Sequence, residues 1–189
     1  MIRFVYAFVG AVALAHITAG IASAQQSTSP PAATATQPPS AAIAASAAAS
    51  AGTFVPTASS ANLFEIESSQ LALQRSQSSK VKDFAQRMVT DHNMAASKMK
   101  QALSDAKIAP PPEKLNAKDQ KAYDNLKAVA PTGFDKAYIE AQYMAHVEAV
   151  NLFTAYSKNG DNPRLKALAA DLLPTLQGHL DHISKLRSS

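Results

Sequence analysis

The chain has no cysteine and no tryptophan, and aromatic residues fill only 6% of its 189 positions. Without cysteine it can form neither a disulfide nor a thiolate metal site, and it has no cysteine for a lipoprotein anchor. It also lacks a Gly-x-Ser-x-Gly elbow, a glycine-rich phosphate loop and a His-Glu-x-x-His pair. The enzyme classes built on those motifs are therefore excluded, and a non-enzymatic role is favoured.

A clustered basic region is also missing. The 18 basic residues exceed the 14 acidic ones by four, but the lysines stand singly between acids. Because a nucleic-acid footprint needs basic residues gathered on one face, we predict no nucleic-acid partner. The expected partner is an unidentified protein or another component of the cell envelope.

Long hydrophobic stretches are absent except at the start of the chain. Residues 1–24 begin with Met-Ile-Arg, continue as an apolar run to Ile21 and end in Ala-Ser-Ala. This order predicts a secretory signal peptide cleaved after Ala24, and so a periplasmic or secreted protein. An uncleaved N-terminal membrane anchor is the alternative, since about 20 apolar residues can span a bilayer.

Residues 25–56 are rich in alanine, serine, threonine, proline and glutamine, with prolines at 30, 31, 38 and 39. Such a composition offers too little apolar surface to offset the entropy lost on ordering. We therefore predict a disordered linker at 25–56 and a folded domain at 57–189.

Apolar residues in this domain recur at helical spacing, and no stretch alternates with period two, which predicts an all-α fold. Four long helices are expected with a shorter one at 116–129. The long ones start at Ser59 or Ser60, near Ser79, at a capping box in 132–135, and at the Asn162 cap before Pro163. Two tight hairpins joined by a long B–C crossover that contains the short helix indicate a ferritin-like antiparallel four-helix bundle.

Each predicted long helix carries one polar group within its apolar stripe: Glu67, His92, His146 and His179. Burying an imidazole or carboxylate is costly unless a partner satisfies it, so four on separate helices suggest a shared site. In each hairpin we counted residues from the connecting turn to the polar group on either helix, at a rise of about 1.5 Å per residue. Glu67 and His92, and likewise His146 and His179, then differ in height along the helix axis by less than roughly one helical turn. The sequence does not decide whether the two pairs meet.

Three imidazoles and a carboxylate would suit one transition-metal ion, either Zn, Fe, Cu or Mn. Asp91 could orient a histidine on a neighbouring helix by accepting a hydrogen bond from the ring nitrogen that does not bind the metal. The thioethers of Met88, Met94, Met99 and Met144 would favour copper if they converged, although methionine more often fills a core. The alternative to a metal site is a hydrogen-bonded polar cluster that fixes the packing.

Residues 62–186 resemble the bacterial family known as domain of unknown function 4142, which is grouped with ferritin-like proteins. The matching stretches are 71–73, 84–92 (Phe-Ala-Gln-Arg-Met-Val-Thr-Asp-His), 134–138, the helix around His146, and 173–180. The resemblance implies a secreted or envelope-associated helical bundle of unassigned role. The chain departs from di-iron ferritins, because it has no Glu-x-x-His pair, and ferroxidase or storage activity is not carried over.

The sequence supports two functions. The first is an exported, non-enzymatic bundle that acts as a binding or stress-related module. The second is a mononuclear metal-binding protein that uses Glu67, His92, His146 and His179.

Overall fold

The computed structural model describes residues 49–189, and within them the all-α prediction is confirmed. The described part contains five α-helices and one 3₁₀ turn: α2 (Ala51–Arg75), α3 (Ser79–Ala106), α4 (Ala117–Ala128), η1 (Pro131–Gly133), α5 (Phe134–Asn159) and α6 (Pro163–Arg187). The predicted signal peptide and residues 25–48 of the predicted linker lie outside the described residues. Over the part described, none of the helices has an apolar stretch long enough to cross a membrane.

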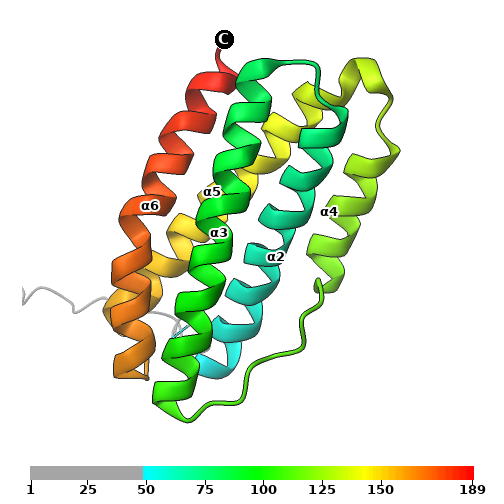
Figure 1. The fold of residues 1–189 in the computed structure, drawn as a ribbon. Coiled ribbons are helices and arrows are strands. Elements are labelled where there is room, and N and C mark those ends of the chain that lie inside the picture. The colour runs from blue at the N-terminus through cyan, green and yellow to red at the C-terminus, as the bar shows by residue number, and fades with distance from the viewer. Residues whose placement is uncertain (1–48) are drawn as a thin grey trace, which may run out of the picture. The chain divides into compact units, whose positions relative to one another are not determined.

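The four long helices pack side by side as two antiparallel hairpins. Helices α2 and α3 form the first hairpin and α5 and α6 the second, with α3 against α6 and α2 against α5 (Figure 1). The shorter α4 lies on the outside, where it covers α2 and touches α5. Helix α2 is therefore covered on two sides.

The folded domain begins earlier than the composition indicated. Helix α2 starts at Ala51, capped by the Ser50 side chain, rather than at Ser59 or Ser60. Phe54 and Val55, at the end of the predicted linker, are 0% and 4% exposed. The boundary at residue 57 is therefore wrong, because an alanine- and serine-rich stretch becomes helical once it has an apolar surface to pack against.

Two other helix ends test the capping predictions. Asn162 caps α6 as expected, since its Oδ1 accepts from the backbone N–H groups of Arg164 and Leu165. The capping box before α5 is wrong: Thr132 lies in the 3₁₀ turn, and the cap residue Gly133 makes no side-chain capping bond. Pro131 at the start of that turn fixes its own φ near −65°, which suits a tight turn at this point.

Two apolar clusters occupy opposite ends of the helix pack. One gathers the start of α2, the ends of α3 and α5, and the start of α6 around Phe54, Leu103, Phe153, Tyr156 and Leu165. The other gathers the opposite ends of those helices around Val81, Phe84, Met88, Tyr138 and Ile183. A polar layer lies between the two clusters, and it holds the candidate site.

Candidate metal centre

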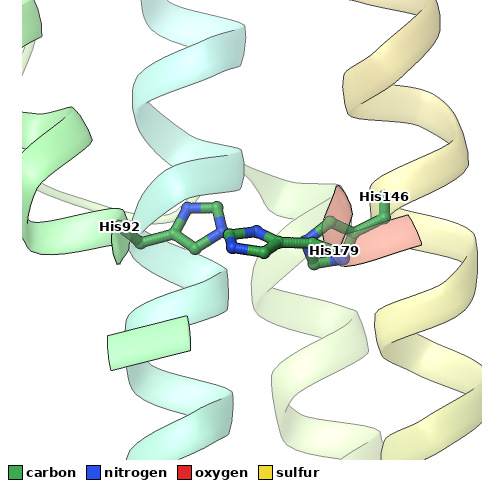
Figure 2. A group of neighbouring side chains, drawn as sticks. All are labelled: His92, His146 and His179. Carbon is green, nitrogen blue, oxygen red and sulfur yellow. The ribbon is translucent and has the colours of Figure 1, made fainter. Parts of the chain in front are cut away.

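Three of the four predicted site residues come together in the interior. His92 on α3, His146 on α5 and His179 on α6 are 5%, 1% and 1% exposed. Their ring centroids are 5.3 to 5.8 Å apart, and Figure 2 shows the rings directed toward one another. One ring nitrogen from each lies within 4.8 Å of one from each of the others. The two hairpins therefore meet at the level that sequence spacing predicted within each.

The outer nitrogen of His92 is held by Asn62 of α2. The Asn62 Nδ2 donates to the backbone oxygen of His92 at 3.0 Å, which leaves the amide Oδ1 as the atom 2.9 Å from His92 Nδ1. Because that oxygen can only accept, His92 Nδ1 carries the proton. The other nitrogen, Nε2, is therefore a lone-pair acceptor.

The same logic sets the tautomers of the other two rings. His146 Nδ1 lies 2.9 Å from the backbone oxygen of Gln142, and His179 Nε2 lies 2.8 Å from Oδ2 of Asp91. A carbonyl and a carboxylate both accept, so these nitrogens donate. The contact with His179 is the role predicted for Asp91, which also binds Arg87 at 3.3 Å.

The three remaining ring nitrogens have no hydrogen-bond partner within residues 49–189. They are Nε2 of His92, Nε2 of His146 and Nδ1 of His179, and all are buried. Buried polar atoms normally find a partner, so three such atoms in one layer need an explanation. Each carries a lone pair, and a cation is the partner that could satisfy all three at once.

Burial keeps the three imidazoles neutral at pH 7. The pKa of His92 lies well below its usual range, because of burial first and then the neighbouring His146 and His179. Burial lowers the pKa of His146 to about 4, and it also lowers the pKa of His179, although the hydrogen bond that His179 donates to Asp91 acts in the opposite direction. Neutral imidazole is the form that binds metal ions.

Glu67 does not lie with the three histidines, so its place in the predicted site is corrected. It is only partly buried, and it is absent from the metal-compatible group in residues 49–189. Asn62, Glu65 and Ser69 are α2 side chains that make contacts in or beside the histidine layer, and Glu67 makes none of them.

The buried carboxyl of this layer is Glu65, which the apolar pattern did not indicate. It is 4% exposed, and its Oε1 lies 3.6 Å from His146 Nδ1. Two residues along a helix turn the side chain by about 200°, so Glu65 and Glu67 face nearly opposite ways. The signal for Glu65 was a stripe of small residues on the same face: Ala58, Ser68, Ser69 and Ala72, all buried.

The methionine thioethers do not converge on the histidines as a group. Met88 is fully buried in one apolar cluster and Met99 belongs to the other. Met94 and Met144 are 54% and 49% exposed. Core filling explains Met88 and Met99, and the methionines give no separate support to copper.

A protein-family model described as "Domain of unknown function (DUF4142)" matches residues 35–186. The chain belongs to this family. The match starts before residue 62, where the resemblance began, and ends at the same residue, 186. The earlier start agrees with a domain that begins before residue 57.

Two solved structures share the fold of this DUF4142 domain. A structure of CopM in the Cu(II)-bound form has a TM-score of 0.62 at 17% identity, covering 74% of this chain and 96% of that one. A DUF305 fragment from Deinococcus radiodurans has a TM-score of 0.62 at 14% identity, covering 71% and 93%. At such identities the likeness concerns the fold alone. No curated protein is significantly similar to the chain.

Proposed function

We propose that this DUF4142 domain binds one transition-metal ion through Nε2 of His92, Nε2 of His146 and Nδ1 of His179. The observation that carries the proposal is the set of three buried lone pairs without a protein partner in the described part of the chain. In each ring the outer nitrogen donates to an amide, a carbonyl or a carboxylate. Such outer contacts orient metal-binding histidines and raise their basicity.

The ligand set favours copper or zinc over manganese. Imidazole nitrogens suit Zn, Cu and Fe, whereas Mn prefers carboxylate and water oxygens. No carboxylate belongs to the close group of possible ligands in residues 49–189, Glu67 included. Cu(II) binds most tightly in the usual order of divalent ions, and the fold is shared with a protein whose structure holds Cu(II). Copper is therefore the first ion to test, and zinc the second.

The histidines need a modest adjustment to close on an ion. Metal–nitrogen bonds of about 2.0–2.1 Å in a tetrahedral site place the ligand atoms about 3.3 Å apart. One nitrogen of each ring lies within 4.8 Å of one nitrogen of each of the others, so each ring has to move inward by on the order of 1 Å. Rotation of side chains on fixed helices supplies a movement of this size.

The proposal also includes the compartment in which the domain acts and a ferritin-like connection between its helices. If residues 1–24 act as a cleaved signal, the domain binds its metal in the periplasm or outside the cell and serves there in metal handling or oxidative stress. The order of two hairpins joined by a long connection supports a ferritin-like assignment. The absence of any Glu-x-x-His pair in the chain argues against di-iron chemistry.

Bound metal in the purified chain, prepared without a histidine tag, tests the proposal. We expect one equivalent of Cu(II) or Zn(II) by elemental mass spectrometry and calorimetry, and its loss in His92→Ala and His179→Ala. The matched control is His182→Ala, which lies one turn from His179 on α6 but outside the close group. If all variants and the wild type stay metal-free with normal melting curves, the layer is a structural polar cluster.

A further inference from the structure

The histidine layer borders a cavity of about 510 Å³ between α2, α3, α5 and α6. His92, His146 and His179 line it together with apolar side chains that include Met99, Ala149, Phe153 and Leu176. Its outer part is lined by side chains that are exposed, among them Met94, Lys98 and Lys114, so it reaches the surface. A volume of this size holds a small ligand.

The carboxyl groups nearest to the histidines lie on the outer side of the rings. Asp91 contacts Nε2 of His179, and Glu65 lies near Nδ1 of His146, both nitrogens that carry the proton. Neither belongs to the group whose ligand atoms come within 4.8 Å in residues 49–189. Three neutral imidazoles would therefore leave a bound divalent ion with at least one open coordination position and its full charge.

A divalent charge that is buried without a counter-charge is unfavourable. The cavity gives an outside ligand access to the layer, and basic side chains (Arg87, Lys98, Lys100 and Lys114) outnumber acidic ones (Glu65, Asp91 and Glu113) along it. Arg87, Lys98 and Lys100 are partly neutralised by Asp91, Asp171 and Glu113. The lining thus has no surplus of negative charge to balance the ion, and an anion from outside is the component that can supply it.

We propose that a small anion from this cavity, such as a short carboxylate or a monovalent inorganic anion, completes the coordination of the metal. The inference rests on the proposed metal site and adds its open position. Sites with three protein ligands and one exchangeable position are the arrangement that zinc uses when it must bind a further molecule. The domain would then bind metal and anion together instead of enclosing the metal with protein ligands alone.

Azide is the probe for this position, added to the full chain loaded with one equivalent of Cu(II). We expect a saturable azide-to-copper charge-transfer band and a change in the copper electron paramagnetic resonance spectrum. Ala149→Leu places extra methyl groups in the cavity, and we expect it to lower azide affinity about tenfold or more while copper stays at one equivalent. The matched control is Ala155→Leu, exposed on the same helix and outside the cavity, which should bind azide like the wild type.

Each contrary result has its own meaning. If the wild type binds copper but azide changes neither spectrum, the open position is refuted while the metal site stands. If azide binds only in Glu65→Gln, Glu65 supplies the fourth ligand and the inference is wrong. Equal azide affinity in Ala149→Leu and the wild type would show that azide does not enter through this cavity, which also overturns it. If no copper binds, the proposed function fails first.

Discussion

The apolar cluster around Phe54 and the histidine layer a few turns away use the same four helices in different ways. At the apolar end Phe54 stacks on Tyr156 at 3.8 Å and meets Phe153 edge-on at 5.2 Å, and the Tyr156 hydroxyl donates to Asp161. In the histidine layer, among the residues described, five polar side-chain atoms of Glu65, His92, Gln142, His146 and His179 are buried without a partner. The apolar end is fully packed, whereas polar atoms in the histidine layer lack hydrogen-bond partners among the described residues.

The histidine layer, and not the apolar end, is the part of the bundle that is available to bind a ligand. Burying an unsatisfied polar atom costs about 1–3 kcal/mol, so a layer with several of them is destabilising unless something binds there. The rings are nevertheless oriented from behind by Asn62, Gln142 and Asp91. Orientation without satisfaction is typical of a binding site and not of a structural polar cluster.

The largest loss of stability is expected from a substitution in the apolar cluster around Phe54. Phe54→Ala should lower the free energy of unfolding by about 3–5 kcal/mol, because a fully buried aromatic ring is lost and a cavity remains. Urea denaturation measures it, with the exposed Thr57→Ala on the same helix as control, expected to change by less than about 0.5 kcal/mol. A loss below about 1 kcal/mol for Phe54→Ala would place the start of the domain after residue 54.

In the histidine layer, removal of an orienting group should have a double effect. Asp91→Ala leaves the His179 Nε2–H without an acceptor, so we expect a loss of about 1–3 kcal/mol without metal. Metal affinity should fall about 10- to 100-fold, because the ring is no longer held in its tautomer. Calorimetry and urea denaturation measure the two effects.

The control for Asp91→Ala is Arg87→Ala, which removes the other partner of the carboxylate at an exposed position. It should change stability by less than about 1 kcal/mol, as exposed ion pairs do. Equal effects of the two substitutions would mean that Asp91 acts on the surface and not through His179.

The pH dependence of the metal-free protein separates Glu65 from the apolar clusters, whose only buried titratable groups are tyrosines with pKa values raised above their usual range. The folded pKa of Glu65, about 8, exceeds its ordinary 4.5 because of burial. Its contribution to stability is therefore present below pH 4.5 and lost as pH rises through about 8. Between pH 6.5 and 9 the free energy of unfolding should fall by about 2 kcal/mol. Urea denaturation should show no such fall in Glu65→Gln.

The Glu65→Gln variant also allows the titration of His146 to be measured below pH 6.5. The folded pKa of His146, about 4, lies below its ordinary 6.5 because of burial. Stability from the neutral imidazole is present above pH 6.5 and is lost as pH falls toward 4. In Glu65→Gln the free energy of unfolding should decrease over that range, and a flat profile would contradict a neutral, buried His146.

The smallest expected effect lies on the surface. Lys98 binds Asp171 of α6 at 2.7 Å, but both side chains are more than half exposed. Lys98→Ala should change the free energy of unfolding by less than about 1 kcal/mol, and less still at high salt. Thermal melting at two salt concentrations checks this, and a larger loss would show that the rim of the cavity contributes to stability.

Much of the histidine site was predictable from spacing alone. His92 and His179 have apolar neighbours three, four and seven positions away, and a helix places such residues on one buried face. Heights counted from the second turn correctly placed His146 and His179 at one level. The same reasoning failed for Glu67, because helix α2 has two covered sides and its apolar residues do not all face the histidines.

Local sequence therefore determined the helices, most of their ends and the inward direction of three imidazoles, because helical periodicity depends only on neighbours along the chain. Tertiary packing decided that the two hairpins meet at one level and that Glu65 is buried in place of Glu67. It also decided that the outer ring nitrogens of His92 and His179 donate to Asn62 and Asp91, whereas His146 donates to Gln142 of its own helix, four residues away. These outcomes depend on contacts between residues 30 to 88 positions apart, or on which helix covers which face, and the pattern of a single helix carries no information about either.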